Sequence, residues 1–359
     1  TPRSHSVQNA WSTPGSAEFD FRSDTITTPT TSMLMAIQNT TLFDDGYGED
    51  PTTSSLEAHM AELCGHEAGV FLLSGTMGNQ IALRSLLTQP PHAVLCDHRA
   101  HILCLEAGGV SMLTGAMVSG VVPSNGNYLL LEDIEKHVIL SDDCHACPTK
   151  VISIENTLRG IITPLTEVQR ISVFARKHGI KMHLDGARLW EVVAAGAGSL
   201  SEYGAYFDSM TLCYSKGLGA PVGSILVGSE EFIKRARWMR QAIGGTLRQA
   251  GVLTSAARNA IDVNFGVGSN GEGNVLKRTH AIAQRIAAFW LSLGGSIEHP
   301  VHTNMVWIDL KKAGVDPQRL RDVAKSKGVK LTRGRIVVHY QISDEAVDRL
   351  KDVLATVMQ

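Results

Sequence analysis

The sequence predicts an α/β fold: a large domain with a mostly parallel sheet between helices, and a small α/β domain at the C-terminal end. In the middle of the chain, short apolar runs alternate with stretches of helical periodicity, which is typical of a parallel sheet covered on both faces. A glycine-rich segment, 266–274, then precedes a second series of helical and strand-like stretches. A length of 359 residues suits two domains.

The alternation is clearest between residues 151 and 214. Residues 151–154 predict a strand, and residues 166–178 predict a helix that ends at Gly179. Thr166 and Gln169 have the spacing of a capping box at its start. The elements expected next are a strand, a helix and a strand over residues 180–184, 187–197 and 209–214.

The segment after residue 274 predicts the small domain. Its expected elements are, in order, helix 275–293, strand 305–310, helix 317–327, strand 336–340 and helix 343–358. We therefore expect an N-terminal arm at 1–20, a large domain at 21–265 and a small domain at 266–359.

Composition excludes several classes of protein. With 33 Lys and Arg against 35 Asp and Glu, the chain has no basic excess for nucleic-acid phosphates. A hydrophobic content of 43% is ample for a buried core and excludes a largely disordered chain. Six cysteines without a visible secretory leader favour free thiols in a reducing compartment, so we expect a cytoplasmic protein.

Residues 107–131 carry no formal charge and are numerous enough to span a bilayer. Five glycines, Pro123 and the Ser-Asn-Gly-Asn string at 124–127 would break such a helix. We expect a helix end, a buried strand, a turn and a short strand instead, and a soluble protein.

Polar residues follow the predicted strands where the strands end. They are Glu155 and Asn156 after the first strand, Asp185 after the second, and Ser215 and Lys216 after the third. Ligands of open α/β sheets bind at this edge. Asp185 could instead cap the next helix, and Lys216 could be a solvated surface residue. A lysine between an apolar strand and the turn Gly-Leu-Gly-Ala-Pro-Val-Gly is nevertheless a candidate Schiff-base nucleophile, because burial lowers a lysine pKa.

A phosphate site is predicted upstream. An apolar strand at 70–73, the turn Ser74-Gly75-Thr76 and a helix at 79–87 place free backbone N–H groups at a helix start. Dinucleotide and nucleoside-triphosphate motifs are missing here, so a single small phosphate fits better. A phosphate cradle, Asp185 and Lys216 on one sheet edge match the needs of pyridoxal 5′-phosphate (PLP). The lysine binds the aldehyde as an imine, and the carboxylate keeps the pyridine nitrogen protonated.

From residue 21 to the C-terminus the sequence resembles the L-threonine aldolase family, especially its fungal low-specificity members. This resemblance implies the PLP-dependent transferase fold, also called fold type I. The motifs that carry it are Phe21-Arg-Ser-Asp-Thr25, Asp44-Asp-Gly-Tyr-Gly-Glu-Asp-Pro-Thr52, Ser74-Gly-Thr76, Glu106-Ala-Gly-Gly109, Ile154-Glu-Asn-Thr157, His183-Leu-Asp-Gly-Ala-Arg188, Ser215-Lys-Gly217 and Arg248-Gln249.

The resemblance also implies residue roles in the cofactor site. Lys216 would bond to the cofactor, Asp185 would pair with the ring nitrogen, and His101 would stack on the ring. Arg188 would lie near the ring hydroxyl, and Arg248 would reach the phosphate from a neighbouring subunit. The full expected cofactor set is Ser74, Gly75, Thr76, His101, Glu155, Asp185, Arg188, Ser215, Lys216 and Arg248.

For the substrate, the resemblance implies that Ser23 and Arg335 hold the α-carboxylate, with Arg188 nearby. His145 would lie near the β-hydroxyl, and Tyr47 would reach across a dimer interface. A homo-oligomer, expected as a dimer of dimers, would follow, with a small amino acid as its substrate and no membrane or nucleic-acid partner.

The implied reaction is retro-aldol cleavage of L-threonine and L-allo-threonine, with Lys216, His101 and His145 as the catalytic residues. Three departures from the family pattern, at Gly46, Leu105 and Thr246, leave other reactions open. One alternative is a PLP-dependent alanine racemase, with Lys216 serving one face and His101, His145 or water the other. A non-catalytic module that binds a phosphorylated ligand is a further alternative.

Two histidine environments also allow a metal or redox interpretation. Cys144 and Cys147 flank His145 with Cys-x-x-Cys spacing, and His92, His98 and His101 form a loose cluster. The family accounts for His145 without a metal, and no second cysteine pair of matching spacing follows. We therefore expect no metal.

Overall fold

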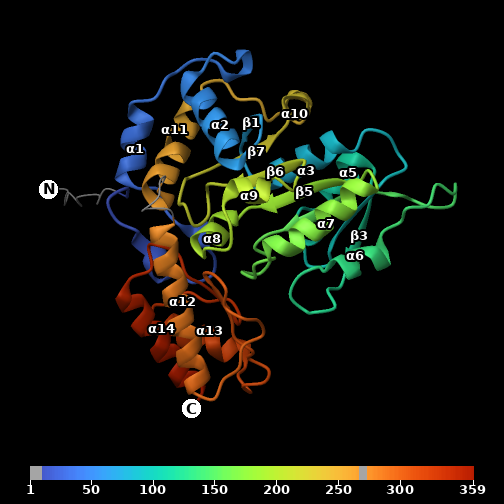
Figure 1. Cartoon of the computed structure of the whole chain (residues 1–359). Helices are drawn as coiled ribbons and strands as arrows, with labels where there is room; N and C mark the ends of the chain where they lie inside the picture. The colour runs from blue at the N-terminus through green and yellow to red at the C-terminus, as the bar shows by residue number, and fades with distance from the viewer. Residues whose placement is uncertain (1–9, 267–272) are drawn as a thin grey trace.

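The computed structural model describes residues 10–266 and 273–359, which form a large part around one sheet and a smaller helical part (Figure 1). Residues 1–9 of the predicted arm, and most of the predicted glycine-rich linker 266–274, lie outside the described residues.

A seven-stranded sheet organises the large part, in the order β1-β7-β6-β5-β4-β2-β3. β7 is antiparallel to both of its neighbours, and the other neighbouring pairs are parallel, so the predicted α/β class with a mostly parallel sheet is confirmed. The strands are β1 (Ala68–Leu72), β2 (Ala93–Asp97), β3 (Met117–Val121), β4 (Thr149–Glu155), β5 (Lys181–Gly186), β6 (Ser209–Cys213) and β7 (Ser224–Gly228).

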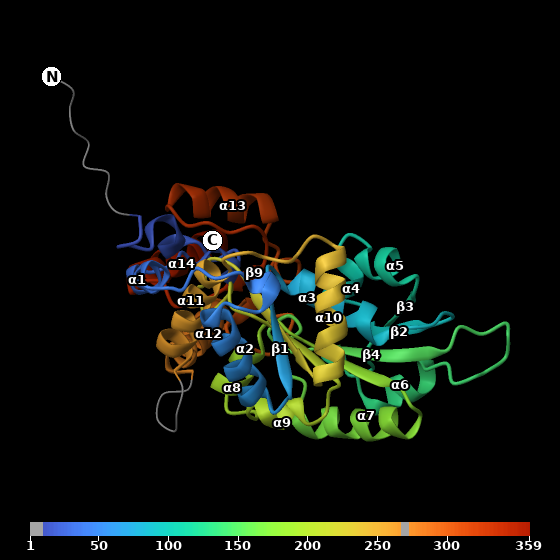
Figure 2. The same cartoon turned by 90° about the horizontal axis from the view of Figure 1, so that it is seen from above.

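Helices cover both faces of the sheet (Figure 2). Successive side chains of β1 point to opposite faces of the sheet. Val70 and Leu72 pack against α3 and α10 on one face. Phe71 packs on the other face, in the core that includes α2, α7, α8 and α9. The helices of the large part are α1 (Thr31–Gln38), α2 (Pro51–Cys64), α3 (Gly75–Leu86), α4 (His101–Cys104), α5 (Gly109–Thr114), α6 (Leu131–His137), α7 (Leu165–Lys177), α8 (Leu189–Ala194), α9 (Leu200–Gly204), α10 (Glu230–Ala242) and α11 (Gly251–Ala260). Short 3₁₀ helices are η1 (Gly15–Phe19), η2 (Asp24–Ile26) and η3 (Asp45–Tyr47), and η4 (Ile261–Phe265) is a π-helix that continues α11.

The smaller part has its own hydrophobic core. It contains α12 (Asn274–Ser292), α13 (Pro317–Ser326), α14 (Asp344–Val357) and the antiparallel pair β8 (Met305–Trp307) and β9 (Arg335–Val337). Phe21 belongs to this core, and its N–H donates to the Lys330 carbonyl at 3.1 Å. The segment around Phe21 therefore runs against the small part, although the prediction starts the large domain there. The predicted boundaries remain predictions.

Most predicted elements lie within a few residues of the observed ones, and Gly179 takes the left-handed φ of +66° that ends α7. The predicted capping box is wrong, because α7 begins at Leu165 after Pro164 and leaves Thr166 inside the first turn. The predicted helix at 187–197 is shorter, because residues 187 and 188 form the turn that leaves β5.

The uncharged segment 107–131 also differs from its prediction. It forms α5 and then β3, which is a partly exposed strand at the sheet edge rather than a buried one. The expected short strand after the turn is absent, and the chain enters α6 at Leu131. Among the helices that the structure describes, none combines the length and apolar character needed to cross a membrane.

Candidate active site

Asp185 lies buried at the carboxyl end of β5 and faces α3. Its Oδ2 accepts a hydrogen bond from Asn79 Nδ2 at 2.8 Å, and its Oδ1 accepts one from the Ala187 N–H at 3.1 Å. The second contact resembles the capping role considered for Asp185. The first ties the carboxylate to the helix whose start is the predicted phosphate site.

The start of α3 has the chemistry of a phosphate cradle. Ser74 caps the helix, its Oγ accepting from the Met77 N–H at 3.1 Å. Gly75 and Thr76 occupy the first helical positions, where backbone N–H groups have no acceptor within the helix. A Cβ at Gly75 would lie 2.6 Å from Cys213 Sγ, so glycine lets this turn pack against the end of β6.

Lys216 follows β6, the strand next to β5. Like its neighbour Ser215 it is half-buried, and its carbonyl accepts from Thr27 Oγ1 at 3.0 Å. Its positive charge acts to lower the pKa of both Asp24 and Glu155, so its side chain lies within electrostatic range of these buried carboxyls.

Glu155, at the end of β4, accepts a hydrogen bond from the His101 backbone N–H at 2.7 Å. Burial and the neighbouring Asp185 carboxylate raise the Glu155 pKa. The His101 imidazole is 33% exposed, and its Nδ1 lies 2.7 Å from Oε1 of the buried Glu106. The hydrogen bond to Glu106 outweighs burial and raises the His101 pKa, so the site favours the imidazolium form.

Arg188 and Arg335 form a basic group beside Asp24. Arg188 donates from Nε to Asp24 Oδ2 at 2.7 Å and from Nη2 to Oδ1 at 2.6 Å. Burial alone would raise the Asp24 pKa, but Arg188 outweighs it and holds that pKa well below its usual range. Arg335 is half-buried and donates to the Arg22 carbonyl at 2.9 Å; in the described chain it forms no ion pair. Ser23 lies between Arg22 and Asp24 in the same segment.

These residues fit PLP. Free N–H groups at the start of α3 suit its phosphate, a buried carboxylate held by Asn79 suits its ring nitrogen, and Lys216 suits its aldehyde. Arg335, which forms no ion pair within the described residues, offers its guanidinium to a substrate carboxylate.

Three predicted site residues lie elsewhere on the chain. They are His145, Tyr47 and Arg248, and all three are largely exposed. The side chain of His145 is 90% exposed, Tyr47 is 79% exposed, and the side chain of Arg248 is 70% exposed. His145 precedes β4 and so lies toward the amino end of that strand, whereas the cluster lies at the carboxyl ends of the strands. Tyr47 and Arg248 are close in space, since the Asp45 N–H donates to the Arg248 carbonyl at 2.8 Å. Their roles remain predictions, which require a second chain.

The metal and redox alternatives gain little from the structure. All six cysteines are free. Two groups among the described residues have possible ligand atoms within 4.8 Å of one another: Asp143, Cys144 and His145 on an exposed loop, and His101, Glu106 and Asp185 in the cluster. In both groups the histidine Nδ1 already contacts a carboxylate oxygen at 2.7 Å.

The predicted histidine cluster takes separate partners. His92 Nε2 contacts the Thr114 carbonyl at 2.9 Å, His98 lies 3.3 Å from Asp97, and His101 binds Glu106.

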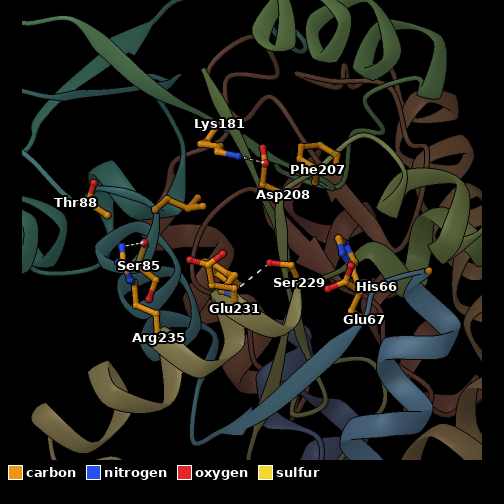
Figure 3. A pocket seen from close by; sticks show the side chains of 13 residues that line it. His66, Glu67, Ser85, Thr88, Lys181, Phe207, Asp208, Ser229, Glu231 and Arg235 are labelled. Carbon is orange, nitrogen blue, oxygen red and sulfur yellow. Dashed lines mark hydrogen bonds and ion pairs between the residues drawn. The ribbon is translucent and has the colours of Figure 1, made fainter. Parts of the chain in front are cut away.

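A large hollow of about 510 Å³ lies elsewhere on the molecule (Figure 3). Lys181 at the start of β5 and Asp208 just before β6 line it, so it opens at the amino ends of these strands. It shares no residue with the cluster around Asp185.

Sequence reasoning assigned no role to four residues that hold the cluster together: Asp24, Asn79, Glu106 and His183. Asp24, Glu106 and His183 lie within the sequence motifs that resemble the threonine aldolase family, so these motifs could have indicated that the three residues belong to the site. Asn79 lies four residues after Gly75, one helical turn along α3, where it faces the same side as the phosphate turn.

The chain is similar to known proteins in both sequence and structure. The sequence pattern of the beta-eliminating lyase family matches residues 20–313. Aldolase vrtJ of Penicillium aethiopicum is 54% identical, over 97% of this chain and 88% of its own length. Alanine racemase TOXG of Cochliobolus carbonum is 45% identical, over 99% and 91%. A low-specificity L-threonine aldolase of Candida albicans is 48% identical, over 92% and 88%. The solved structure of a threonine aldolase from Leishmania major superposes with a TM-score of 0.81 at 21% identity, covering 95% of this chain and all (100%) of the other.

Proposed function

Because the chain belongs to the beta-eliminating lyase family and is a PLP-dependent lyase akin to the threonine aldolases, we propose that it cleaves L-threonine and L-allo-threonine to glycine and acetaldehyde. The observation that carries this proposal is the half-buried Arg335 guanidinium, which forms no ion pair within the described residues and lies beside a cluster that fits PLP. A small amino acid brings one carboxylate, which such a group binds well.

PLP, when bound, supplies an electron sink for the bond that breaks at the substrate Cα. The N–H groups of Gly75 and Thr76 would hold the phosphate, and Asp185 would hold the proton on the ring nitrogen. Ser23 and Arg335 orient the substrate by its α-carboxylate, which selects the bond to be broken. Arg188 stays paired with Asp24, so the net positive charge of this part of the site comes from Arg335.

A retro-aldol reaction needs a base for the β-hydroxyl proton. His101 is poorly suited to this role alone, because its hydrogen bond to Glu106 favours the protonated ring. We therefore assign the proton to His145 of a neighbouring subunit, or to a water between His145 and His101.

This assignment requires a homo-oligomer with its active site at a subunit interface, which we propose to be a dimer of dimers. The exposed positions of Tyr47, His145 and Arg248 support a contribution from a second chain. The six free cysteines support a cytoplasmic location.

Alanine racemisation is the second candidate, supported by the 45% identity to TOXG. The same cofactor site would serve, with Lys216 moving a Cα proton on one face and His101, His145 or water on the other. Leu105, 71% exposed and four residues after His101, is a departure from the family pattern close to the site.

Proton NMR of the PLP-loaded protein with equimolar L-threonine and L-alanine in D₂O tests the two candidates. We expect glycine and acetaldehyde to appear much faster than deuterium enters the alanine Cα position. Rapid deuteration of alanine with accumulation of D-alanine, and threonine nearly unchanged, would favour the racemase. If both amino acids stay unchanged, both assignments fail.

A further inference from the structure

Asn79 joins the two polar parts of the candidate active site. It is buried in α3, and its Nδ2 lies 2.8 Å from Asp185 Oδ2 and 2.9 Å from Glu106 Oε1. Glu106 in turn binds His101 Nδ1 at 2.7 Å. One amide therefore connects the carboxylate expected at the ring nitrogen with the histidine expected to stack on the ring.

The direction of each hydrogen bond in this network follows from its chemistry. Ionised carboxylates only accept, so the amide nitrogen of Asn79 must face Asp185 and Glu106 and gives one hydrogen to each. Its Oδ1 then lies 3.0 Å from His183 Nε2, which must donate, and His183 Nδ1 accepts from Ser209 Oγ at 2.9 Å. Burial lowers the His183 pKa to about 4, which agrees with a neutral ring carrying its proton on Nε2.

Both amide hydrogens of Asn79 are used in this network, and its amide oxygen is held by the hydrogen bond from His183 Nε2. Other charged groups face the same region from neighbouring elements: Glu155 from β4, which accepts from the His101 N–H, and Lys216 after β6. Neither contacts Asn79. Gln80 Nε2 also donates to Glu106, but among the described residues the Asn79 amide is the group that hydrogen-bonds to both Asp185 and Glu106.

We propose that Asn79 is a positioning residue that holds Asp185 and the His101–Glu106 pair as one unit. The carboxylate expected at the ring nitrogen and the imidazole expected to stack on the ring then keep a fixed distance and orientation to each other. This inference rests on the roles given to Asp185 and His101 under the proposed function. Asn79 acts only through these residues and touches no reacting atom.

Asn79→Asp is the sharpest test because it keeps the shape and the acceptor for His183 but removes both donors. Hydrogen bonds to charged groups are strong, so we expect PLP to bind the variant apoprotein at least about tenfold more weakly. The new carboxylate in contact with His183 should raise the His183 pKa, which NMR of the apoprotein detects. In the wild type the same spectra should show a neutral His183 with its proton on Nε2.

Asn304→Asp is a matched control, since Asn304 is also buried but donates to the Val338 carbonyl at 3.0 Å in the small part. It should leave PLP affinity and the His183 signal as in the wild type. If Asn79→Asp does not fold, Asn79→Ser leaves one donor instead of two and adds no charge, and we expect PLP to bind it more weakly as well.

Asp185→Ala separates the two levels of the argument. If it weakens PLP binding whereas a folded Asn79 variant binds PLP like the wild type, the positioning role is wrong and the proposed site stands. If Asp185→Ala itself leaves PLP affinity unchanged, the assignment of Asp185 under the proposed function fails. Weaker binding in both, with the His183 shift, supports the inference.

Discussion

The carboxyl edge of the sheet and the outer surface that carries Tyr47, His145 and Arg248 differ in how they hold polar side chains. At the sheet edge, Asp185 and Glu106 are buried and receive hydrogen bonds from α3. On the surface, side chains are at least 70% exposed; His145 contacts Asp143 in the same loop, and Arg248 forms an ion pair with Asp44.

This difference separates two kinds of site residue. The first kind is placed by the folding of one chain. Burying a polar group without a partner is costly, and the buried carboxylates of Asp24, Glu106 and Asp185 each accept hydrogen bonds. The second kind is largely exposed in the single chain, and its proposed place in the active site depends on a second chain. The largest expected effects test the first kind, and the next tests the second.

Removing Lys216 should have the largest effect. In Lys216→Ala the covalent attachment of PLP is lost, and turnover of threonine should fall by more than about a thousandfold. Borohydride reduction followed by mass spectrometry should trap the cofactor on the wild type and not on the variant. Lys181→Ala is the control, because Lys181 pairs with Asp208 at the opposite edge of the sheet and should keep full activity.

His145→Asn tests the exposed group. If His145 is the base, turnover should fall by about 10²–10⁴-fold while PLP stays bound. Mixing Lys216→Ala and His145→Asn subunits should then restore part of the activity, because some sites in the mixed oligomer combine an intact Lys216 with an intact His145. Unchanged turnover in the single variant would remove His145 from this role, and an inactive mixture would contradict sharing between subunits.

Helices and strands were predictable where the periodicity of apolar residues lies within the element itself. The alternation of strands and helices from residue 151 to 214 and the helices after residue 274 needed only local patterns. β3 was not predictable in this way, because its place at the sheet edge is decided by which strands pair, and an uncharged sequence is compatible with either place.

The site was predictable in part for a related reason. Asp185 and Lys216 end adjacent parallel strands, so the sheet brings them to one edge. Asp24 and Asn79 reach the same site from a segment far upstream and from a helix. Their pairing with Arg188 and Asp185 depends on tertiary packing that no local pattern contains.

Asp24→Asn tests how much the buried ion pair between Asp24 and Arg188 stabilises the folded chain. It leaves the largely buried Arg188 without its carboxylate, so the free energy of unfolding should fall by about 3–5 kcal/mol. Asp262→Asn, which breaks an exposed pair with Arg258, should cost less than about 1 kcal/mol. Denaturant unfolding of the apoproteins measures both, and equal losses would contradict the contrast.

The pH dependence of this loss has a definite sign. Because Arg188 lowers the folded-state pKa of Asp24, the stabilisation is present above the ordinary aspartate pKa of about 3.9 and disappears as the pH falls through the folded value. The difference between wild type and Asp24→Asn should therefore be constant from about pH 5 to pH 8 and shrink in acid.

Glu106→Gln should have the smallest effect, since the His101 ring is partly exposed. The hydrogen bond to Glu106 raises the folded-state pKa of His101, so its stabilisation is complete below the ordinary histidine pKa of about 6.5 and disappears as the pH rises through the folded value. The variant should lower the His101 pKa, although Asp185 and Glu155 still face the ring. NMR titration of the apoprotein measures this shift, with Glu132→Gln, at an exposed partner of Arg170, as the control. If His101 titrates at the same pH in wild type and Glu106→Gln, the buried carboxylate does not set its charge, and His101 again becomes available as the base in the retro-aldol step.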